Sequence, residues 1–246
     1  MELSFETDTG LAHQAALGLI VLQADETIEN EFRPLFDLDG VTLNHTRIKS
    51  APDVTPETLM SMKAGLTGAA TLLPNARPLN VIGYGCTSAS TVIGFGEVAK
   101  AVQKAHPTAK VTNPAAAVLT ALEHLNVKKV GVVTPYIPVV SQAVVSLLED
   151  NGFEAVSVGS FGQSEEAVVA RISPASTKDA ICAVGKAPDI DAVFASCTNL
   201  RTFPVIEECE KQLGKPVISS NSALAWHMMT LAGLATKAKG PGRLFG

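Results

Sequence analysis

The chain has 246 residues, of which 46% are hydrophobic and 17% charged, with a formal net charge of −5 at pH 7. This composition predicts one large or two modest globular domains, and the mild negative charge argues against a nucleic-acid partner or a membrane surface. Four cysteines without framework spacing, no apolar run of about 18 residues and an acidic N-terminus predict a cytoplasmic protein with free thiols and no secretory signal.

The first half of the chain alternates short apolar runs with amphipathic stretches. We expect a loose arm over residues 1–16. The apolar runs predict strands over residues 17–22, 41–48, 79–85 and 109–112. Helical stretches lie between them, over residues 26–36, 55–73 and 92–105. Thr55 before Pro56 is typical of a helix start, because threonine caps the first turn and proline fits its first position.

The second half repeats this alternation. Its apolar runs predict strands over residues 129–134, 154–158, 192–195 and 216–219. Helices are expected over residues 115–125, 138–151, 165–170, 174–186, 203–213 and 222–234. Strands that alternate with helices at this spacing predict parallel sheets covered by helices on both faces.

The likeness of the two halves predicts two pseudo-symmetric, flavodoxin-like α/β domains that face each other across a central cleft. We expect the first domain to comprise residues 1–112 together with 222–246, and the second to comprise residues 113–221. Ligands of such sheets bind beyond the carboxyl ends of the strands. The loops that should line the cleft are residues 23–27, 86–90, 134–136 and 197–199.

Two stretches, residues 81–88 and 192–199, have similar sequences. Each is an apolar run, broken by small residues, that leads into a Cys-Thr pair at Cys86 or Cys197. A single cysteine after a buried strand is usually a core residue, but the repetition favours a functional pair. Both cysteines are expected to precede helices, and a helix N-terminus lowers the pKa of a thiol below its usual value of about 8.5. We therefore predict catalytic thiols at these two positions.

Polar residues next to the cysteines would complete such a site. Thr87, Ser88, Thr198 and Asn199 could hold a carboxylate and stabilise an enolate-like intermediate, and Tyr136 could add a phenolic donor. One thiolate could remove a proton from a carbon while the other thiol returns one to the opposite face, which is racemisation. Alternatively, a thiolate could add to a double bond, allow rotation and leave, which is cis–trans isomerisation. Neither reaction needs a cofactor.

The remaining candidates are assigned structural roles. Cys182 is expected to pack in the core, and Cys209 should be inert because neighbouring carboxylates raise its pKa. No cysteine and histidine have the spacing of metal ligands, so we expect no metal site. The pattern G-x-G-x-x-G is absent, which argues against a dinucleotide cofactor.

Five short motifs resemble the aspartate/glutamate racemase superfamily, and the similarity spans nearly the whole chain. They are residues 18–21, 86–88, 134–136, 196–198 and 242–245. Within the superfamily, the branch of maleate cis–trans isomerases and arylmalonate decarboxylases is the most similar. The decarboxylases carry a glycine in place of the first cysteine, so the presence of Cys86 argues against decarboxylation.

One departure from that branch concerns charge. The maleate isomerases have an asparagine after the first strand that contacts a substrate carboxylate, whereas this chain has Asp25. Their second-half asparagine falls near Glu166. An acid would repel a second carboxylate and attract an ammonium group, although Asp25 could instead cap the following helix. Residues 18–29 also resemble racemase-like proteins of ectoine breakdown, which implies a diaminobutyrate-type compound.

We therefore predict a cofactor-independent racemase of a small amino acid or derivative. Maleate-type cis–trans isomerisation is the alternative, and a decarboxylase or a non-catalytic binding protein is more remote. Cys86 and Cys197 are the predicted catalytic residues. The predicted substrate-binding residues are Asp25, Thr87, Ser88, Tyr136, Glu166, Thr198 and Asn199. The expected substrate is a small carboxylate or amino acid, and we expect a homo-oligomer without nucleic-acid or membrane partners.

Overall fold

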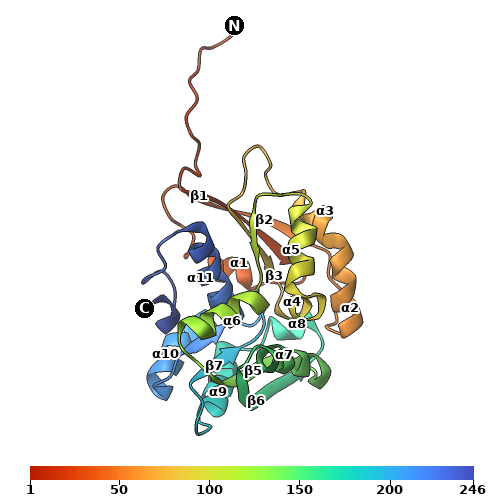
Figure 1. Cartoon of the computed structure of the whole chain (residues 1–246), viewed down its shortest axis with the longest axis vertical. Helices are drawn as coiled ribbons and strands as arrows, with labels where there is room; N and C mark the ends of the chain where they lie inside the picture. Colours follow the sequence, from red (N-terminus) through yellow and green to blue (C-terminus); the bar gives the residue numbers. More distant parts are fainter.

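A computed structural model describes residues 1–246 and contains two four-stranded parallel sheets (Figure 1). The first sheet consists of β1 (Ala15–Leu22), β2 (Val41–Ile48), β3 (Val81–Gly85) and β4 (Lys110–Thr112). The second consists of β5 (Lys129–Tyr136), β6 (Glu154–Gln163), β7 (Ala192–Ala195) and β8 (Val217–Ser219). Their strand orders, β2-β1-β3-β4 and β6-β5-β7-β8, are equivalent. The structure thus confirms the predicted fold of two similar α/β units.

The central strands of the two sheets are buried and occupy equivalent places. β1 and β5 each pair with neighbours on both sides, and their continuous apolar runs are almost wholly buried, as parallel strands covered on both faces must be. β3 and β7 occupy equivalent places beside them. Cys86 and Cys197 therefore follow equivalent strands, at the carboxyl ends of the two sheets.

The helices of the first half are shorter than expected. They are α1 (Ile28–Phe32), α2 (Pro56–Ser61), α3 (Leu66–Ala70), α4 (Thr87–Ile93) and α5 (Phe95–Gln103), with a 3₁₀ turn η1 (Met62–Gly65) after α2. The helix expected over residues 26–36 ends early, because Pro34 lacks the N–H that would continue it. Gly94, at a φ of 87°, separates α4 from α5, so the helix expected over residues 92–105 begins only at Phe95, and residues 92–93 end α4 instead.

The helices of the second half follow the expectation closely. They are α6 (Pro114–His124), α7 (Pro138–Asp150), α8 (Glu166–Val169), α9 (Pro174–Gly185), α10 (Phe203–Leu213) and α11 (Ser220–Ala232). α11 starts two residues early because Ser219 and Ser222 cap it reciprocally, at 3.1 and 2.8 Å. A 3₁₀ turn η2 (Arg243–Phe245) ends the chain.

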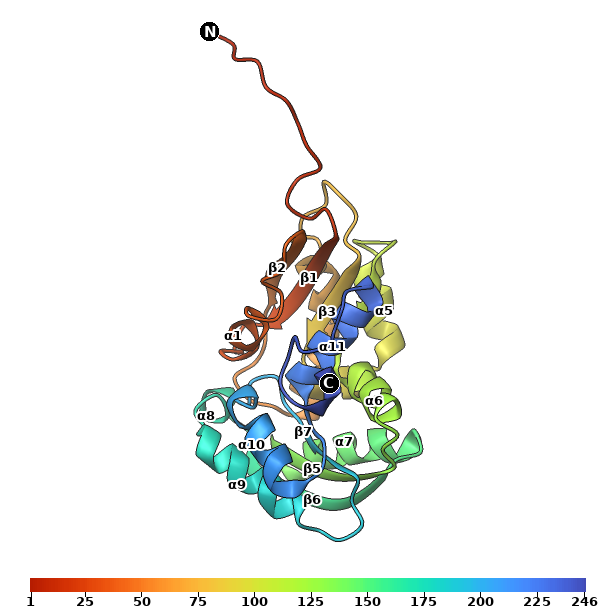
Figure 2. The ribbon, with the colours of Figure 1, turned by 90° about the vertical axis from the view of Figure 1, so that its left-hand side faces the viewer.

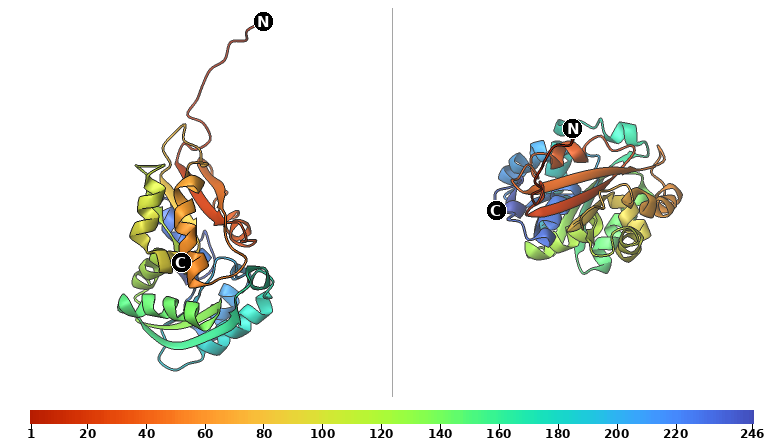
Figure 3. Two further views of the ribbon diagram at one scale, coloured as in Figure 1. Left: turned by 90° about the vertical axis from the view of Figure 1, so that its right-hand side faces the viewer. Right: turned by 90° about the horizontal axis from the view of Figure 1, so that it is seen from above.

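The chain returns to the first sheet at its end. α11 packs against β3 and α6, and it also meets β8 (Figure 2). We retain the boundaries at residues 112 and 222 as a proposal. Residues 1–14 form no helix or strand, and the exposed part before Ala12 extends away from the first sheet (Figure 1 and Figure 3, left). None of the helices combines the length and apolar character that crossing a membrane requires.

A buried carboxyl group, that of Glu31 on α1, joins the two halves of the chain. It accepts hydrogen bonds from the backbone N–H groups of Thr202 and Phe203 at the start of α10, at 2.8 and 2.9 Å. The side-chain amide of Asn221 on α11 donates a third, at 2.7 Å. Burial raises the pKa of Glu31 to about 7, and these donors only partly oppose that rise.

Glu31 should make stability depend on pH. Its pKa rises from 4.5 to about 7 on folding, so the folded state keeps a proton that the unfolded chain releases, and stability falls as pH rises through this window. The loss from this group is at most about 3 kcal/mol. The free energy of unfolding, measured by urea denaturation between pH 4.5 and 7, should therefore fall less steeply with pH for Glu31→Gln than for wild type.

The change of stability with pH, rather than the stability itself, is the quantity to compare. The NH2 group of a glutamine at position 31 would face the NH2 group of Asn221, which lowers stability at every pH. Glu149→Gln, an exposed substitution on α7, is the matched control and should keep the wild-type slope. A Glu31→Gln curve parallel to wild type would show that Glu31 is ionised in the folded protein.

Candidate active site

Cys86 sits where β3 passes directly into α4. It is the N-cap residue of α4, and its Sγ accepts a hydrogen bond from the N–H of Ala89 at 3.4 Å. The Ser88 hydroxyl lies 3.7 Å from the same sulfur. The side chain is buried, with 3% of its surface exposed. The expectation that Cys86 precedes a helix is confirmed.

Cys197 is held differently. No helix follows it directly, because α10 begins only at Phe203, so the expectation that both thiols begin helices is wrong here. Its φ of 131° is strained for a residue with a side chain. The Cys197 N–H donates to Ser220 Oγ at 2.9 Å, and its Sγ accepts from the N–H of Asn199 at 3.3 Å. A tight loop, rather than a helix terminus, therefore places this thiol.

The two cysteine loops are fastened to each other. Ser220, at the start of α11, accepts from the Thr87 hydroxyl at 2.7 Å and from the Cys197 N–H at 2.9 Å. The Thr198 hydroxyl donates to the carbonyl of Gly85 at 3.3 Å. Thr87 and Thr198, predicted as substrate ligands, thus use their hydroxyls to join the loops. Ser220 was not predicted, because its polar stretch indicated only a helix start.

Tyr136, Asp25 and Glu166 complete the surroundings of the thiols. Tyr136, at the end of β5, is buried and its hydroxyl reaches Cys197, whose pKa it lowers. Asp25 and Glu166 lie close enough to both thiols for their charges to raise the thiol pKa values. The structure thus brings together the predicted site residues of both halves, and their roles in binding and catalysis stay predictions.

Only one oxygen of the Asp25 carboxyl makes hydrogen bonds. Its Oδ1 accepts from the N–H groups of Thr27 and Ile28, at 2.8 and 2.9 Å, so it caps the start of α1. Its Oδ2 has no hydrogen-bond partner, although only 3% of the residue is exposed. Glu166 accepts from the Asn199 amide at 2.9 Å. The helix-cap interpretation of Asp25 is therefore correct for one oxygen and leaves the other free for a ligand.

Both thiols are protonated at neutral pH, because both are buried. Burial raises the pKa of Cys86 to about 12 and that of Cys197 well above its ordinary value, and the charges of Glu166 and Asp25 add to both rises. The expectation of lowered thiol pKa values is therefore wrong. The amide of Ala89 does lower the pKa of Cys86, but the loss of water outweighs it.

The two equivalent loops after β2 and β6 contact each other beside Glu166. They meet in a short antiparallel bridge, with Val54 N–H to the Ser164 carbonyl at 2.8 Å and Glu166 N–H to the Pro52 carbonyl at 3.0 Å. A cavity of about 440 Å³ lies at this bridge. Its lining residues are Ala24, Glu26, Pro52, Asp53, Glu165, Glu166 and Ala167. The ion pair between Glu26 and Arg171, at 2.9 Å, spans the same junction between α1 and α8 (Figure 2).

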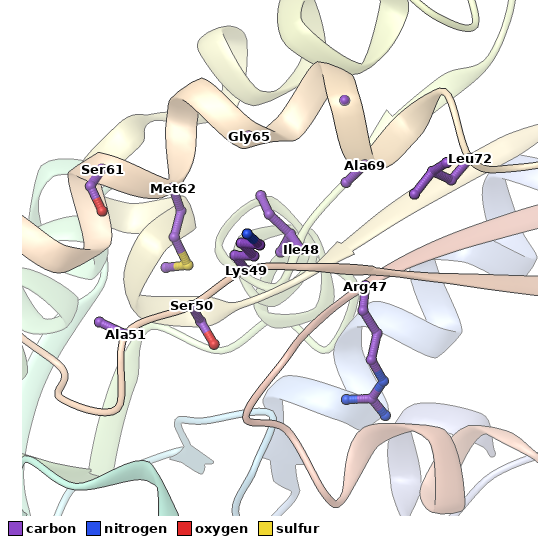
Figure 4. A pocket seen from close by; sticks show the side chains of 11 residues that line it. Arg47, Ile48, Lys49, Ser50, Ala51, Ser61, Met62, Gly65, Ala69 and Leu72 are labelled. Carbon is purple, nitrogen blue, oxygen red and sulfur yellow. The ribbon is translucent and has the colours of Figure 1, made fainter.

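A second cavity, of about 450 Å³, lies between the end of β2 and the α2–α3 segment (Figure 4). Arg47, Lys49, Met62 and Leu72 are among its lining residues, and none of the predicted site residues is. The other two cysteines lie elsewhere, with Cys182 Sγ 3.9 Å from Cys209 Sγ between α9 and α10. Both are buried, and burial rather than carboxylates is the main cause that raises the pKa of Cys209 to about 12.

Comparison with known proteins identifies this arrangement. A profile of the arylmalonate decarboxylase family matches residues 80–245, which is more than half of the chain. The chain belongs to the arylmalonate decarboxylase family. The predicted resemblance is thereby confirmed.

Individual relatives show how far the similarity extends. The arylmalonate decarboxylase of Bordetella bronchiseptica is 36% identical over 136 residues, 54% of this chain and 57% of that enzyme. A maleate isomerase of Pseudomonas putida is 25% identical over 241 residues, 93% of this chain and 96% of that one.

A solved structure extends the similarity to the fold. It shows the maleate cis–trans isomerase of Nocardia farcinica as a mutant with a covalently bound succinylcysteine intermediate. Its TM-score is 0.85 at 26% identity, and the match covers 94% of this chain and 98% of that one. The protein is thus an enzyme of the maleate isomerase and arylmalonate decarboxylase type. Of the reactions predicted from sequence, cis–trans isomerisation fits these relatives better than racemisation.

The raised thiol pKa values predict slow alkylation. Near neutral pH, iodoacetamide should modify Cys86 far more slowly than free cysteine, because the thiolate is the reactive form. Glu166→Gln removes a negative charge and should lower the pKa of Cys86, so that its alkylation is several-fold faster above pH 8. Peptide mass spectrometry measures both rates.

Glu165→Gln, at the exposed neighbouring position, is the matched control for that experiment and should leave the alkylation rate of Cys86 unchanged. If Cys86 of the wild-type protein reacted at neutral pH as fast as free cysteine, its thiol would be ionised at rest, and the burial argument would fail.

Proposed function

We propose that this protein is a cofactor-independent cis–trans isomerase of the maleate isomerase type, acting on a small unsaturated carboxylic acid. The observation that carries the proposal is the pair of thiols at equivalent strand ends of the two sheets, on loops that Ser220 fastens to each other. The near full-length similarity to maleate isomerases supports it.

Cys86 is the better nucleophile of the two. It alone caps a helix, and the N–H of Ala89 already points at its sulfur. Nucleophilic addition requires the thiolate, and a helix N-terminus is the position that stabilises a thiolate, so the capping position of Cys86 favours it over Cys197. Glu166, the carboxyl whose charge acts most strongly on both thiols, accepts the Cys86 proton as substrate binds.

The reaction then proceeds by addition and elimination. The Cys86 sulfur bonds to one alkene carbon, and the electron pair of the double bond moves onto the neighbouring carbon and its carboxylate. Cys197 protonates that carbon, which leaves a single bond free to rotate. Removal of the proton by Cys197 and departure of the Cys86 sulfur restore the double bond in the trans form, with no net change in protons or electrons.

The surroundings of Cys197 suit this second role. Tyr136 and the N–H of Asn199 both lower the pKa of the Cys197 thiol, which stabilises the thiolate left after it protonates the intermediate. A succinylcysteine, the adduct bound in the Nocardia farcinica isomerase, is the species that addition and protonation of maleate would produce.

Serine variants should separate the two thiols. With maleate as substrate, Cys86→Ser should abolish turnover, because a serine hydroxyl is far too weak a nucleophile in this pocket. Cys197→Ser should lower kcat by about 10²–10⁴ and should accumulate an adduct on Cys86. Proton NMR of fumarate formation and intact-protein mass measure the two effects.

Cys182→Ser, on a thiol remote from the pocket, is the matched control and should turn over maleate like the wild type. Substantial fumarate formation by Cys86→Ser would exclude thiol addition at this position.

Racemisation remains a second candidate because of two carboxyl groups. Asp25, with its free Oδ2, and Glu166 could together receive the ammonium group of an amino acid, while the two thiols exchange the proton on its α-carbon. This reading requires Asp25 to be ionised, and it makes maleate a poor substrate.

Heavy-water exchange tests this second candidate. If the protein is a racemase, incubation with the correct amino acid in deuterated buffer should incorporate deuterium at the α-carbon. Asp25→Asn should then lower kcat/KM by about one to two powers of ten, because it removes a charge-assisted contact of roughly 1.5–3 kcal/mol. No deuterium uptake by any small amino acid, alongside turnover of maleate, would eliminate racemisation.

A further inference from the structure

We propose that Asp25 acts as a protonated acid, donating a hydrogen bond from Oδ2 to a carboxylate of the substrate. The inference rests on the proposed cis–trans isomerase function and names one of its binding groups. It assigns Asp25 to substrate specificity and positioning rather than to the chemical step.

Of the two Asp25 oxygens, only Oδ2 can both carry a proton and contact a ligand. Two backbone N–H groups, of Thr27 and Ile28, occupy Oδ1 at 2.8 and 2.9 Å. Oδ2 has no partner, in a residue that is 3% exposed. An ionised oxygen without a partner is costly at such a site, whereas a hydroxyl that meets a ligand oxygen is satisfied.

No cation neutralises the Asp25 side chain. Arg47 is the nearest guanidinium, but its Nη1 donates to the backbone carbonyls of Leu22 and Asp25, at 2.8 and 3.0 Å. Its Nη2 pairs with Glu29. In Figure 4 its side chain points away from Met62 and Leu72, on the other side of the β2 end. Burial therefore outweighs Arg47 and raises the pKa of Asp25.

The groups that face Asp25 add no positive charge. Glu166 on α8 is a second buried carboxyl, and its pKa is raised by burial and by Asp25. The Cys86 and Cys197 thiols are neutral at rest, and the nearby hydroxyl of Thr198 lowers the pKa of Asp25 without outweighing burial. A dicarboxylate beside two ionised carboxyls would meet strong repulsion. Protonation of Asp25 removes its share of that repulsion and supplies a short, charge-assisted hydrogen bond.

Substrate binding should therefore take up a proton at alkaline pH. Succinate, the saturated analogue of maleate, can be titrated calorimetrically into Cys86→Ser at several pH values between 6 and 9, in pairs of buffers that differ in ionisation enthalpy. The uptake should rise toward about one proton per bound succinate as the pH passes the pKa of Asp25 in the free protein, and above that pKa the affinity should weaken about tenfold per pH unit.

Added substitutions assign the proton to a residue. In the Cys86→Ser background, Asp25→Asn should abolish both the proton uptake and the dependence of affinity on pH, while its amide still caps α1. Glu166→Gln should retain the proton uptake. Asp150→Asn, an exposed change at the end of α7, is the matched control for altered charge.

The outcomes are distinct. Succinate binding without proton uptake, or with uptake that survives Asp25→Asn, would overturn the role of Asp25 and leave the isomerase function standing. Maleate turnover by Asp25→Asn but not by the wild-type protein would show that Asp25 is ionised, with the same consequence. Failure of both proteins to bind succinate or to turn over maleate at any pH would instead reject the proposed function.

Discussion

The hydroxyl of Ser220 holds the two cysteine loops together, and the geometry of the site depends on it. It accepts one hydrogen bond from Thr87, beside the first thiol, and one from the N–H of Cys197 itself. Because Ser220 begins α11, a helix that packs on the first sheet, the position of the second thiol is set by an element anchored to the first. The strained φ of Cys197 follows from this fastening, since the loop must turn its N–H toward α11.

Burial explains the electrostatics of the pocket better than any single contact. Two thiols and two carboxyls lie together with little water, and burial is the largest cause of the raised pKa of each of the four, Asp25, Cys86, Glu166 and Cys197. Burial thus disfavours the charged form of each group. A protonated Asp25 would offer a dianionic substrate a hydrogen-bond donor in place of fixed negative charge, while Glu166 keeps its proposed role as acceptor of the Cys86 proton.

The fold could be predicted from sequence because its signals are local and are repeated. The eight strands lie within a few residues of their expected places, except that β6 runs on to Gln163. The cysteine loops could be found because Cys86 and Cys197 recur in the same local pattern. The helix before Pro34 and the break at Gly94 were misjudged, although proline and glycine are the residues that cause them.

The rest depends on how the two halves face each other, which local patterns do not encode. Ser220 and Glu31 are ordinary helix residues in sequence, and only the packing of α10 and α11 gives them their partners. The thiol pKa values were predicted in the wrong direction for the same reason. A helix terminus can be recognised from sequence, whereas the depth to which Cys86 is buried cannot.

The bridge between residues 52–54 and 164–166 has a kinetic consequence. Glu166 belongs to this bridge through its N–H and to the thiol pocket through its carboxyl. Parting the two loops would admit water to the thiols and move the Glu166 carboxyl away from Cys86 in one movement. Transfer of the Cys86 proton to Glu166 then requires the loops to be closed, whereas exchange of substrate and product requires them to be open, so each catalytic cycle includes one opening event that limits turnover when it is slower than the chemistry.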